Sequence, residues 1–456
     1  MLLKNQTIQL QIETVSLDGN GIGRYNDMVV FVPYSAAGDL LIVKIVKIKK
    51  SYAFGIIVDI LFPSPSRISN TGCSSFKKCG GCTFRHIKYE EELRLKRNYL
   101  IDCLKRIGKT ECEVLSIIPS PKENNYRNKT QLPVVSVNNS LQVGFYAQRS
   151  HRIIPFENGC CLQSEGMDFI ADSCCELLDE NNISAYDETS NTGTIRHIVI
   201  RKSSLDGSMM LGLVVNGSQI EHEQEFCKRI TDRCPMVNTI VINENTKNSN
   251  VILGDKTRAI YKDGYIVDSL SGILFRLSLD SFFQINNGSA ELLYKVIAEY
   301  ANAEKNETLI DMYCGVGSIG LFMAKNYKNI IGIEINKNAV LDAVYNAALN
   351  NISNATFINA DVKKACENLS LAGIHADTVV IDPPRKGCDP KTLNSIVNLS
   401  PNKIIVVSCN PATLARDLLF LNENGYLTEK VTPVDMFPRT SHVESVALVT
   451  KTGGRE

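Results

Sequence analysis

The sequence predicts an α/β fold whose C-terminal half is a parallel, Rossmann-like sheet. From about residue 305 onward, the strand-like runs TLIDMYC, NIIGIEI, DTVVIDPP and KIIVVSC alternate with helix-like segments. This alternation is typical of βα units that build a parallel sheet. The chain closes on HVESVALVTK, an alternating strand with no helix behind it. We expect this sheet domain to span residues 271–456.

The N-terminal sixty residues predict a small β-barrel. Short alternating runs, among them TIQLQIETV, DMVVFVP and AFGIIVDIL, are separated by Gly, Asn and Pro turns over residues 1–60. FPSPSRISN is then typical of a linker. A central α/β domain is expected over residues 70–270. Its amphipathic helix, residues 86–108, is a candidate to pack on the C-terminal domain.

The composition indicates an intracellular protein, and one basic segment is compatible with a polyanion partner. The 49 Lys and Arg balance 49 Asp and Glu, but residues 71–152 carry 15 basic against 7 acidic residues, an excess of 8. Such an excess suits a phosphate backbone or a solvated face. The chain has no apolar run long enough to span a bilayer, and its N-terminus does not resemble a signal peptide. We expect a soluble, cytoplasmic protein with no membrane partner.

Fifteen cysteines in such a chain predict thiols or metal ligands rather than disulfides. CSSFKKCGGC places Cys73, Cys79 and Cys82 in one Gly-containing loop, and ENGCCLQ adds Cys160 and Cys161. Three close thiolates and a distant fourth suit tetrahedral zinc or a [4Fe-4S] cluster. The second C-x2-C pair typical of zinc sites is missing, which favours the cluster.

The glycine loop YCGVGSIG, followed by Glu334 at the end of the next strand, predicts a nucleotide-type ligand. This layout suits the pyrophosphate of NAD or S-adenosylmethionine, with the acidic side chain on ribose hydroxyls. Asp382 in IDPPRKG decides between them. Methyltransferases that act on planar nitrogenous groups place an Asx-Pro-Pro turn there, and NAD folds do not need one. The sheet is therefore expected to be a class I S-adenosylmethionine-dependent methyltransferase sheet, with an NAD oxidoreductase as the alternative.

Cys409 in VVSCNPATLARD is expected at a strand-to-helix corner, where a helix N-terminus favours the thiolate. A buried strand can also end in Cys simply because the side chain packs as a small hydrophobe. A methyltransferase that acts on a planar nitrogenous base such as uracil would need this thiol. Carbon-5 of uracil becomes nucleophilic only after a thiolate has added to carbon-6, which favours a catalytic role for Cys409. A base must afterwards remove the carbon-5 proton, and Glu444 in SHVESVALV is the candidate.

These motifs resemble the RumA/TrmA family of RNA uracil-5-methyltransferases, most closely its bacterial 23S ribosomal RNA branch. DMYCGVGSIGL, IDPPRKG, VSCNPATLARD and HVESVALV occur in the family's order, and the resemblance covers essentially the whole chain. It implies a TRAM-like OB barrel at the N-terminus, with Cys409 as nucleophile and Glu444 as base. It further implies five residues that contact S-adenosylmethionine: Gln284, Tyr313, Glu334, Asp361 and Asp382.

The resemblance also implies a cluster and an RNA target. The matching ligands are Cys73, Cys79 and Cys82, with Cys161 chosen over Cys160 because it directly precedes Leu-Gln. Bacterial tRNA-directed members characteristically lack the barrel and the cluster cysteines, so 23S rRNA is the expected substrate, with the target base flipped out. No stable protein partner is implied.

Three expectations stay open at this point. A tRNA uracil-5-methyltransferase and a non-catalytic RNA-binding iron-sulfur protein are the alternatives in function. Phe437 and Arg439, in DMFPRTSHVE, are candidates to line the uracil pocket.

Overall fold

The N-terminal part of the chain is a curled six-stranded sheet. The computed structural model describes residues 2–453. The strands pair in the order β1-β5-β6-β4-β3-β2, and β1 also contacts β3. Alternate side chains, among them Leu10, Val32, Leu41 and Val43, fill the interior. The strand bounds are β1 (Thr7–Gln11), β2 (Thr14–Val15), β3 (Asn20–Tyr25), β4 (Met28–Pro33), β5 (Leu40–Ile48) and β6 (Tyr52–Phe62).

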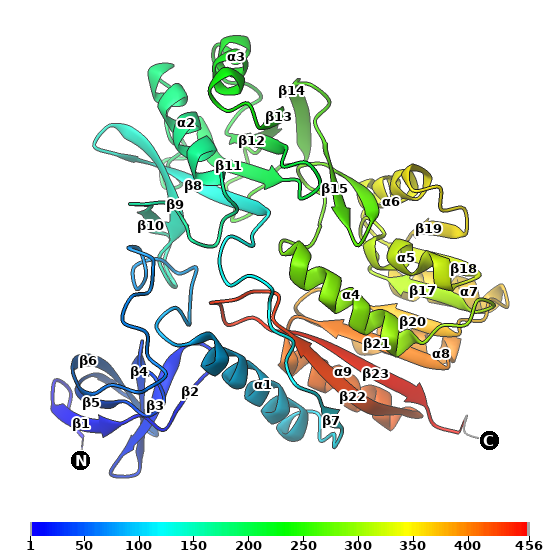
Figure 1. The fold of residues 1–456 in the computed structure, drawn as a ribbon, viewed down its shortest axis with the longest axis horizontal. Coiled ribbons are helices and arrows are strands. Elements are labelled where there is room, and N and C mark those ends of the chain that lie inside the picture. The colour runs from blue at the N-terminus through cyan, green and yellow to red at the C-terminus, as the bar shows by residue number, and fades with distance from the viewer. Residues whose placement is uncertain (1, 454–456) are drawn as a thin grey trace.

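The central part is a seven-stranded sheet covered by two helices (Figure 1). Its order is β10-β9-β8-β11-β12-β13-β14, and only β12 and β13 pair in parallel. Apolar residues of α2 and α3 pack on it and form one core with its strands. The bounds are β8 (Lys129–Val137), β9 (Ser140–Tyr146), β10 (Ile153–Pro155), α2 (Met167–Glu180), β11 (Ile195–Lys202), β12 (Met209–Val215), α3 (Glu223–Arg233), β13 (Val237–Glu244) and β14 (Lys256–Tyr261).

The C-terminal sheet has eight strands in the order β19-β18-β17-β20-β21-β23-β22-β7. The five from β19 to β21 run parallel, whereas β23 is antiparallel to both β21 and β22. The strand bounds are β17 (Thr308–Met312), β18 (Asn329–Glu334), β19 (Ala355–Asn359), β20 (Thr378–Ile381), β21 (Lys403–Ser408), β22 (Tyr426–Val434) and β23 (Glu444–Lys451). The βα alternation predicted from the sequence is present.

Helices cover both faces of this sheet. Side chains of α4, α5 and α6 contribute to one core, with the hairpin β15–β16, and those of α7, α8 and α9 contribute to the other. The bounds are β15 (Ile266–Leu270), β16 (Ile273–Leu277), α4 (Asn287–Ala301), α5 (Ser318–Met323), the 3-10 turn η1 (Ala324–Asn326), α6 (Lys337–Leu349), α7 (Val362–Leu371), α8 (Pro390–Leu399) and α9 (Pro411–Glu423).

One helix and one strand from before the central part belong physically to the C-terminal sheet. Helix α1 (Tyr89–Arg106) packs against α9, and Leu100 and Leu104 enter the same core as Leu414 and Leu418 (Figure 1). Strand β7 (Glu113–Val114) pairs in parallel with β22. The chain therefore passes through the C-terminal domain before it builds the central one.

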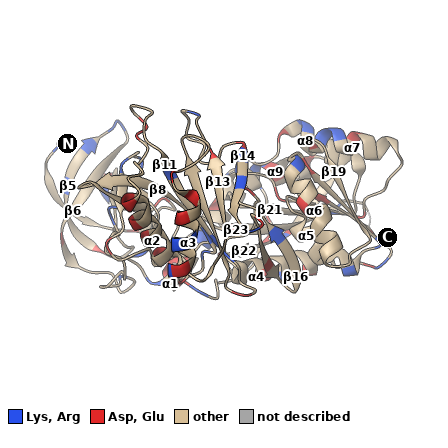
Figure 2. Ribbon diagram, turned by 90° about the horizontal axis from the view of Figure 1, so that it is seen from above, with Lys and Arg blue, Asp and Glu red and all other residues tan. Residues whose placement is uncertain are grey.

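Charge is spread over the whole molecule. Figure 2 shows Lys and Arg interspersed with Asp and Glu rather than segregated by domain. Part of the basic excess in residues 71–152 is internal, because Lys96 is fully buried between two carboxylates and Arg97 donates to the carbonyls of Val114 and Leu115. That excess is therefore not a solvated RNA-binding face throughout. Within residues 2–453, no helix is long and apolar enough to cross a membrane.

Candidate active site

The predicted site residues gather at the edge where the parallel strands of the C-terminal sheet end. Four neighbouring strands, β18, β17, β20 and β21, end there. The residues at or directly after those ends are, in the same order, Glu334, Tyr313, Asp382 and Cys409. Asp361 follows β19, the next strand outward. The carboxyl ends of parallel strands are where open α/β sheets bind their ligands.

Strand register brings Cys409 and Glu444 together. Ser408, the last residue of β21, pairs with Ser445 of the antiparallel strand β23. Cys409 directly follows Ser408, and Glu444 directly precedes Ser445. The thiol and the carboxyl group therefore lie opposite each other where the two strands meet the sheet edge. Glu444 is held from its other side by pairing with Val434 of β22. A thiol and a carboxyl group fixed by a ladder are well placed to act on one substrate.

The local structure around Cys409 follows the sequence, but its acidity does not. Asn410 caps α9 by accepting from the N–H of Ala412, and Pro411 opens the helix, as predicted. The helix N-terminus was expected to favour the thiolate. Instead the pKa of Cys409 is raised to about 11, first by burial and then by the carboxylate of Glu444, while Arg385 opposes the rise. Desolvation and a nearby anion therefore outweigh the helix terminus in the free protein.

Glu444 is a buried carboxyl group with a strongly perturbed acidity. The residue is 8% exposed, and its pKa is raised to about 8, first by burial and then by the negative charge of Asp382. The pKa of Asp382 is itself raised to about 6 by burial. Arg385 lowers the pKa of Glu444. Two carboxyl groups of perturbed pKa beside a thiol and a cation are characteristic of catalytic sites.

Sequence reasoning missed Arg385 and His442, which complete this cluster. The Nη2 of Arg385 lies 3.2 Å from Nε2 of His442. The pKa of His442 is lowered to about 4, first by burial and then by Arg385, so the ring is neutral and its Nε2 accepts from the guanidinium. The ring of Phe437 packs edge-on against His442, with 5.9 Å between the ring centroids. The sequence does place both residues near predicted ones: Arg385 lies three positions after Asp382 in IDPPRKG, and His442 lies two positions before Glu444 in HVES.

The glycine loop has the geometry that a close-approaching ligand requires. Gly315 and Gly317 adopt positive φ of 54° and 82°, and Tyr313, directly after β17, is also left-handed at 62°. The N–H of Gly315 donates to the carboxylate of Glu334 at 3.1 Å. A second carboxylate that sequence reasoning missed, Asp311, is fully buried and accepts from the N–H of Gly320 at 2.9 Å. Both acidic groups brace the loop.

The remaining predicted ligand contacts differ in what they do in the structure. The carboxylate of Asp361 accepts from the N–H groups of Lys363 and Lys364 and so caps α7. Gln284 precedes α4, and its backbone carbonyl accepts from the side-chain amide of Asn128, directly before β8. Nearby, Phe282 is 70% exposed, a large apolar surface that sequence reasoning did not single out.

The side chains of Phe437 and Arg439 point in different directions. Phe437 lies beside His442 in the candidate site. Arg439 turns the other way, because its Nη1 donates to the carbonyl of Ile87 at 2.9 Å and its Nη2 pairs with Glu123. The expectation that Arg439 lines the uracil pocket was therefore wrong, since carboxylates outside the pocket hold its guanidinium.

Five cysteines border one cavity of about 230 Å³ between the cysteine loop and the central domain: Cys73, Cys79, Cys82, Cys160 and Cys161. Arg85 and Arg127 also line it. Within the part of the chain that the structure describes, no three or more His, Cys, Asp or Glu side chains converge on a single metal ion. The predicted iron-sulfur cluster is thus not shown, although its predicted ligands lie together.

Cys160 and Cys161 face different neighbours. Burial raises the pKa of Cys160 to about 11, with a further rise from the Cys82 thiol, and Cys160 in turn raises the pKa of Cys79. The thiol of Cys161 instead donates to the carbonyl of Gly72 at 2.7 Å, on the outer side of the cavity. Cys160 therefore lies beside the thiols of Cys82 and Cys79, and Cys161 lies beside that of Cys73.

Comparison with protein-family models finds two matches. The tRNA (Uracil-5-)-methyltransferase model matches residues 88–452, and the TRAM domain model matches residues 2–58. Among curated proteins, an uncharacterised RNA methyltransferase of Halalkalibacterium halodurans is 41% identical over 447 residues, covering 98% of this chain and 97% of that protein. One of Clostridium tetani is 38% identical over 453 residues, covering 99% and 98%.

A solved structure with the same overall fold is the Pyrococcus abyssi tRNA (uracil-54, C5)-methyltransferase in complex with S-adenosyl-L-homocysteine. It is 26% identical, with a TM-score of 0.76, and the match covers 97% of this chain and 100% of that one. The methyltransferase fold and the N-terminal TRAM domain are thereby confirmed. Because the match covers nearly the whole of both chains, it includes the N-terminal barrel of this chain. The tRNA-modifying enzyme therefore has a barrel as well. The presence of the barrel therefore does not separate an rRNA from a tRNA substrate.

Proposed function

The chain belongs to the tRNA (uracil-5-)-methyltransferase family, and from that premise we propose that it methylates carbon-5 of a uridine in 23S ribosomal RNA. The proposal rests above all on the strand register that sets Cys409 opposite Glu444 beside Asp382. A nucleophile and a base in one pocket are what carbon-5 methylation requires.

Cys409 acts first. After its proton has left, the sulfur adds to carbon-6 of uracil, and the electron pair of the 5,6 double bond moves to give an enolate. Carbon-5 of that enolate then takes the methyl group that S-adenosylmethionine supplies when bound. Covalent addition thus turns a weak carbon nucleophile into a competent one. Arg385 supports this step, because its cation lowers the pKa of Cys409.

Glu444 acts second. Its carboxylate removes the proton from carbon-5, the 5,6 double bond reforms, and Cys409 leaves carbon-6 as a thiolate. A pKa of about 8 suits this role, because the carboxylate is a stronger base than an exposed one and its ionised form is still accessible near neutral pH.

S-adenosylmethionine fits the glycine loop side of the same edge. Glu334 is suited to the ribose hydroxyls, with Tyr313, Asp361, Asp382 and Gln284 around the rest of the molecule. Asp361 uses only its Oδ1 on backbone N–H groups, whereas each oxygen of Glu334 accepts one, from Gly315 and from Asn336, and keeps a further lone pair for the ligand. Asp382 lies between this side and the Cys409 side, where the methyl group must be delivered.

The cysteine cavity fits a [4Fe-4S] cluster with Cys73, Cys79, Cys82 and Cys160 as its ligands. Thiols that surround a cavity suit a multi-iron cluster better than a single ion, and Arg85 and Arg127 offset its negative charge. Cys160 replaces Cys161 here because its thiol lies beside two of the other ligands, Cys79 and Cys82, whereas that of Cys161 lies beside Cys73 and donates to the carbonyl of Gly72. Four thiolates would leave no iron open, so a cluster held there would be structural and would take no part in methyl transfer.

A second candidate substrate is transfer RNA. It is favoured by the likeness to the Pyrococcus abyssi enzyme, whose name specifies uracil-54 of tRNA. Fragments of 23S rRNA and unmodified tRNA transcripts, each incubated with the protein and methyl-labelled S-adenosylmethionine, separate the two. Label in rRNA alone supports the proposal, and label in tRNA alone would identify transfer RNA as the substrate instead. No label in either would refute the proposed activity.

A further inference from the structure

Arg439 joins three segments that are far apart in the sequence. It lies in the pocket loop, residues 435–443, which runs from the end of β22 to Glu444. Its carbonyl accepts from the N–H groups of Thr83 and Phe84, at 2.7 and 3.1 Å, directly after the last thiol of the cysteine loop. Its own N–H donates to Glu92 of α1 at 2.7 Å. Both backbone groups of this residue are thus engaged by segments that lie more than 300 residues earlier in the sequence.

The side chain of Arg439 adds further contacts to α1 and to Glu123. Its guanidinium lies over the ring of Tyr89, 5.6 Å from the centroid, and pairs with Glu92 and Glu123. The side chain is 9% exposed and that of Glu92 is fully buried. Arg439 also has a left-handed backbone, with φ of 71°. A buried charged group and a strained backbone persist only where their surroundings determine them.

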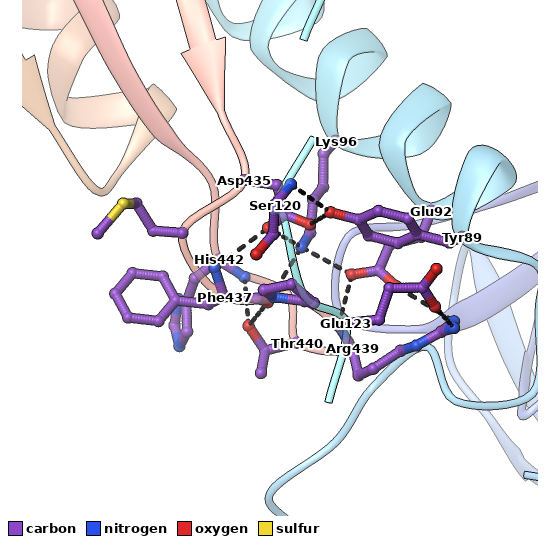
Figure 3. Close-up of polar contacts among 12 residues, drawn as sticks. Tyr89, Glu92, Lys96, Ser120, Glu123, Asp435, Phe437, Arg439, Thr440 and His442 are labelled. Atoms are coloured by element: carbon purple, nitrogen blue, oxygen red, sulfur yellow. Dashed lines mark hydrogen bonds and ion pairs between the residues drawn. The ribbon is translucent and has the colours of Figure 1, made fainter. Parts of the chain in front are cut away.

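A second buried ion pair fastens the start of the same loop (Figure 3). The Nζ of Lys96 donates to Glu92 and to Asp435, both at 2.8 Å, and to the carbonyl of Phe437 at 3.2 Å. Tyr89 donates to the other oxygen of Asp435. Helix α1 therefore holds the loop on both sides of Phe437, whose ring packs on His442.

Glu444 does not depend on these contacts. Its position is set by the pairing of β23 with β21 and β22. The loop side of the uracil pocket, with Phe437 and His442, is instead held by α1 and by the chain that leaves Cys82. The two sides of one pocket thus have separate supports.

We propose that Arg439 is a positioning residue that couples the cysteine loop, residues 73–84, to the uracil side of the pocket. This inference rests on the proposed function for the identity of the pocket, but the coupling itself is a property of the fold. It gives the cysteine loop a role in shaping the substrate site at a distance from the thiols.

Fluorescence tests the coupling without the reaction. The chain contains no Trp, so Phe437→Trp creates a single reporter on the loop. We expect its emission to change when Arg439→Ala, Arg439→Lys or Cys82→Ser is added. The matched control is Lys403→Met, at the opposite end of β21, where Nζ donates to the carbonyl of Ala301 at 2.7 Å. Unchanged emission in Cys82→Ser, or an equal change in Lys403→Met, would overturn the proposal.

Kinetics then test positioning in chains with the native Phe437. Arg439→Ala should lower kcat/KM for RNA by about 10²-fold, the size expected for a misplaced contact, with Arg439→Lys intermediate. The KM for S-adenosylmethionine should stay within about twofold, and Lys403→Met should leave both values unchanged. If Arg439→Ala fails to fold, Arg439→Lys carries the comparison. A proportional loss of affinity for S-adenosylmethionine would indicate general destabilisation and refute the role. If wild-type protein methylates no RNA, the proposed function fails while the fluorescence still decides the coupling.

Discussion

Replacing Glu444 by Gln should make the protein more stable, and more so at alkaline pH. Burial raises the pKa of this carboxyl group from 4.5 to about 8. The folded state therefore holds the proton more tightly than the unfolded state, and wild-type stability falls as the pH rises from 4.5 through about 8. A rise of roughly 3.5 in pKa, at about 1.4 kcal/mol per pH unit, corresponds to roughly 5 kcal/mol. The amide introduced by Glu444→Gln has no proton to lose, so the variant is spared this destabilisation.

Urea unfolding of both proteins at pH 5 and pH 9, followed by circular dichroism, measures the effect. The free energy of unfolding of Glu444→Gln relative to wild type should rise by several kcal/mol between the two pH values, toward the limit of roughly 5 kcal/mol. Glu423→Gln, at the exposed end of α9, is the control and should show no such rise. If the advantage of Glu444→Gln differs by less than about 0.5 kcal/mol between pH 5 and pH 9, the burial argument is refuted.

Three further predictions concern the charge, the cysteine cavity and the helix cap. Arg385→Gln removes the cation that lowers the pKa of Cys409 and of Glu444, so the rise of kcat/KM for RNA with pH should move roughly 1 pH unit to the alkaline side. An unmoved profile contradicts this. Cys160→Ser should lose iron from protein purified without oxygen whereas Cys161→Ser keeps it, and the opposite pattern would restore Cys161 as ligand. Asn410→Ala removes the cap of α9 and should lower the free energy of unfolding by about 1 kcal/mol in chemical denaturation, while an unchanged value would deny the cap a role.

The sequence allowed the sheet and the order of its site residues to be predicted, because both follow from local patterns. Strand-like runs ending in Glu334, Asp382 and Cys409 place those side chains at one edge once the strands are parallel. The position of Glu444 opposite Cys409 could be proposed only from chemistry. Its cause is the antiparallel register of β23, which depends on residues far away in the sequence.

What the sequence did not predict depends on non-local contacts. The raised pKa of Cys409 comes from burial and from Glu444, and the segment VVSCNPATLARD shows neither of them. That segment shows only the helix terminus, which suggested a thiolate. Cys160 and Cys161 are adjacent in sequence, and only the folded chain shows that their thiols have different neighbours. Arg439 was misassigned because its partner Glu92 lies on a helix at the other end of the chain.

A covalent bond between Cys409 and the target uracil is the step on which the proposed reaction depends. RNA transcripts containing 5-fluorouridine, incubated with the protein and S-adenosylmethionine, should give a protein-RNA band on a denaturing gel, because fluorine at carbon-5 cannot be removed as a proton. We expect this band with wild type and its loss in Cys409→Ala. A band that persists in Cys409→Ala, or no band with either rRNA or tRNA, would contradict this mechanism.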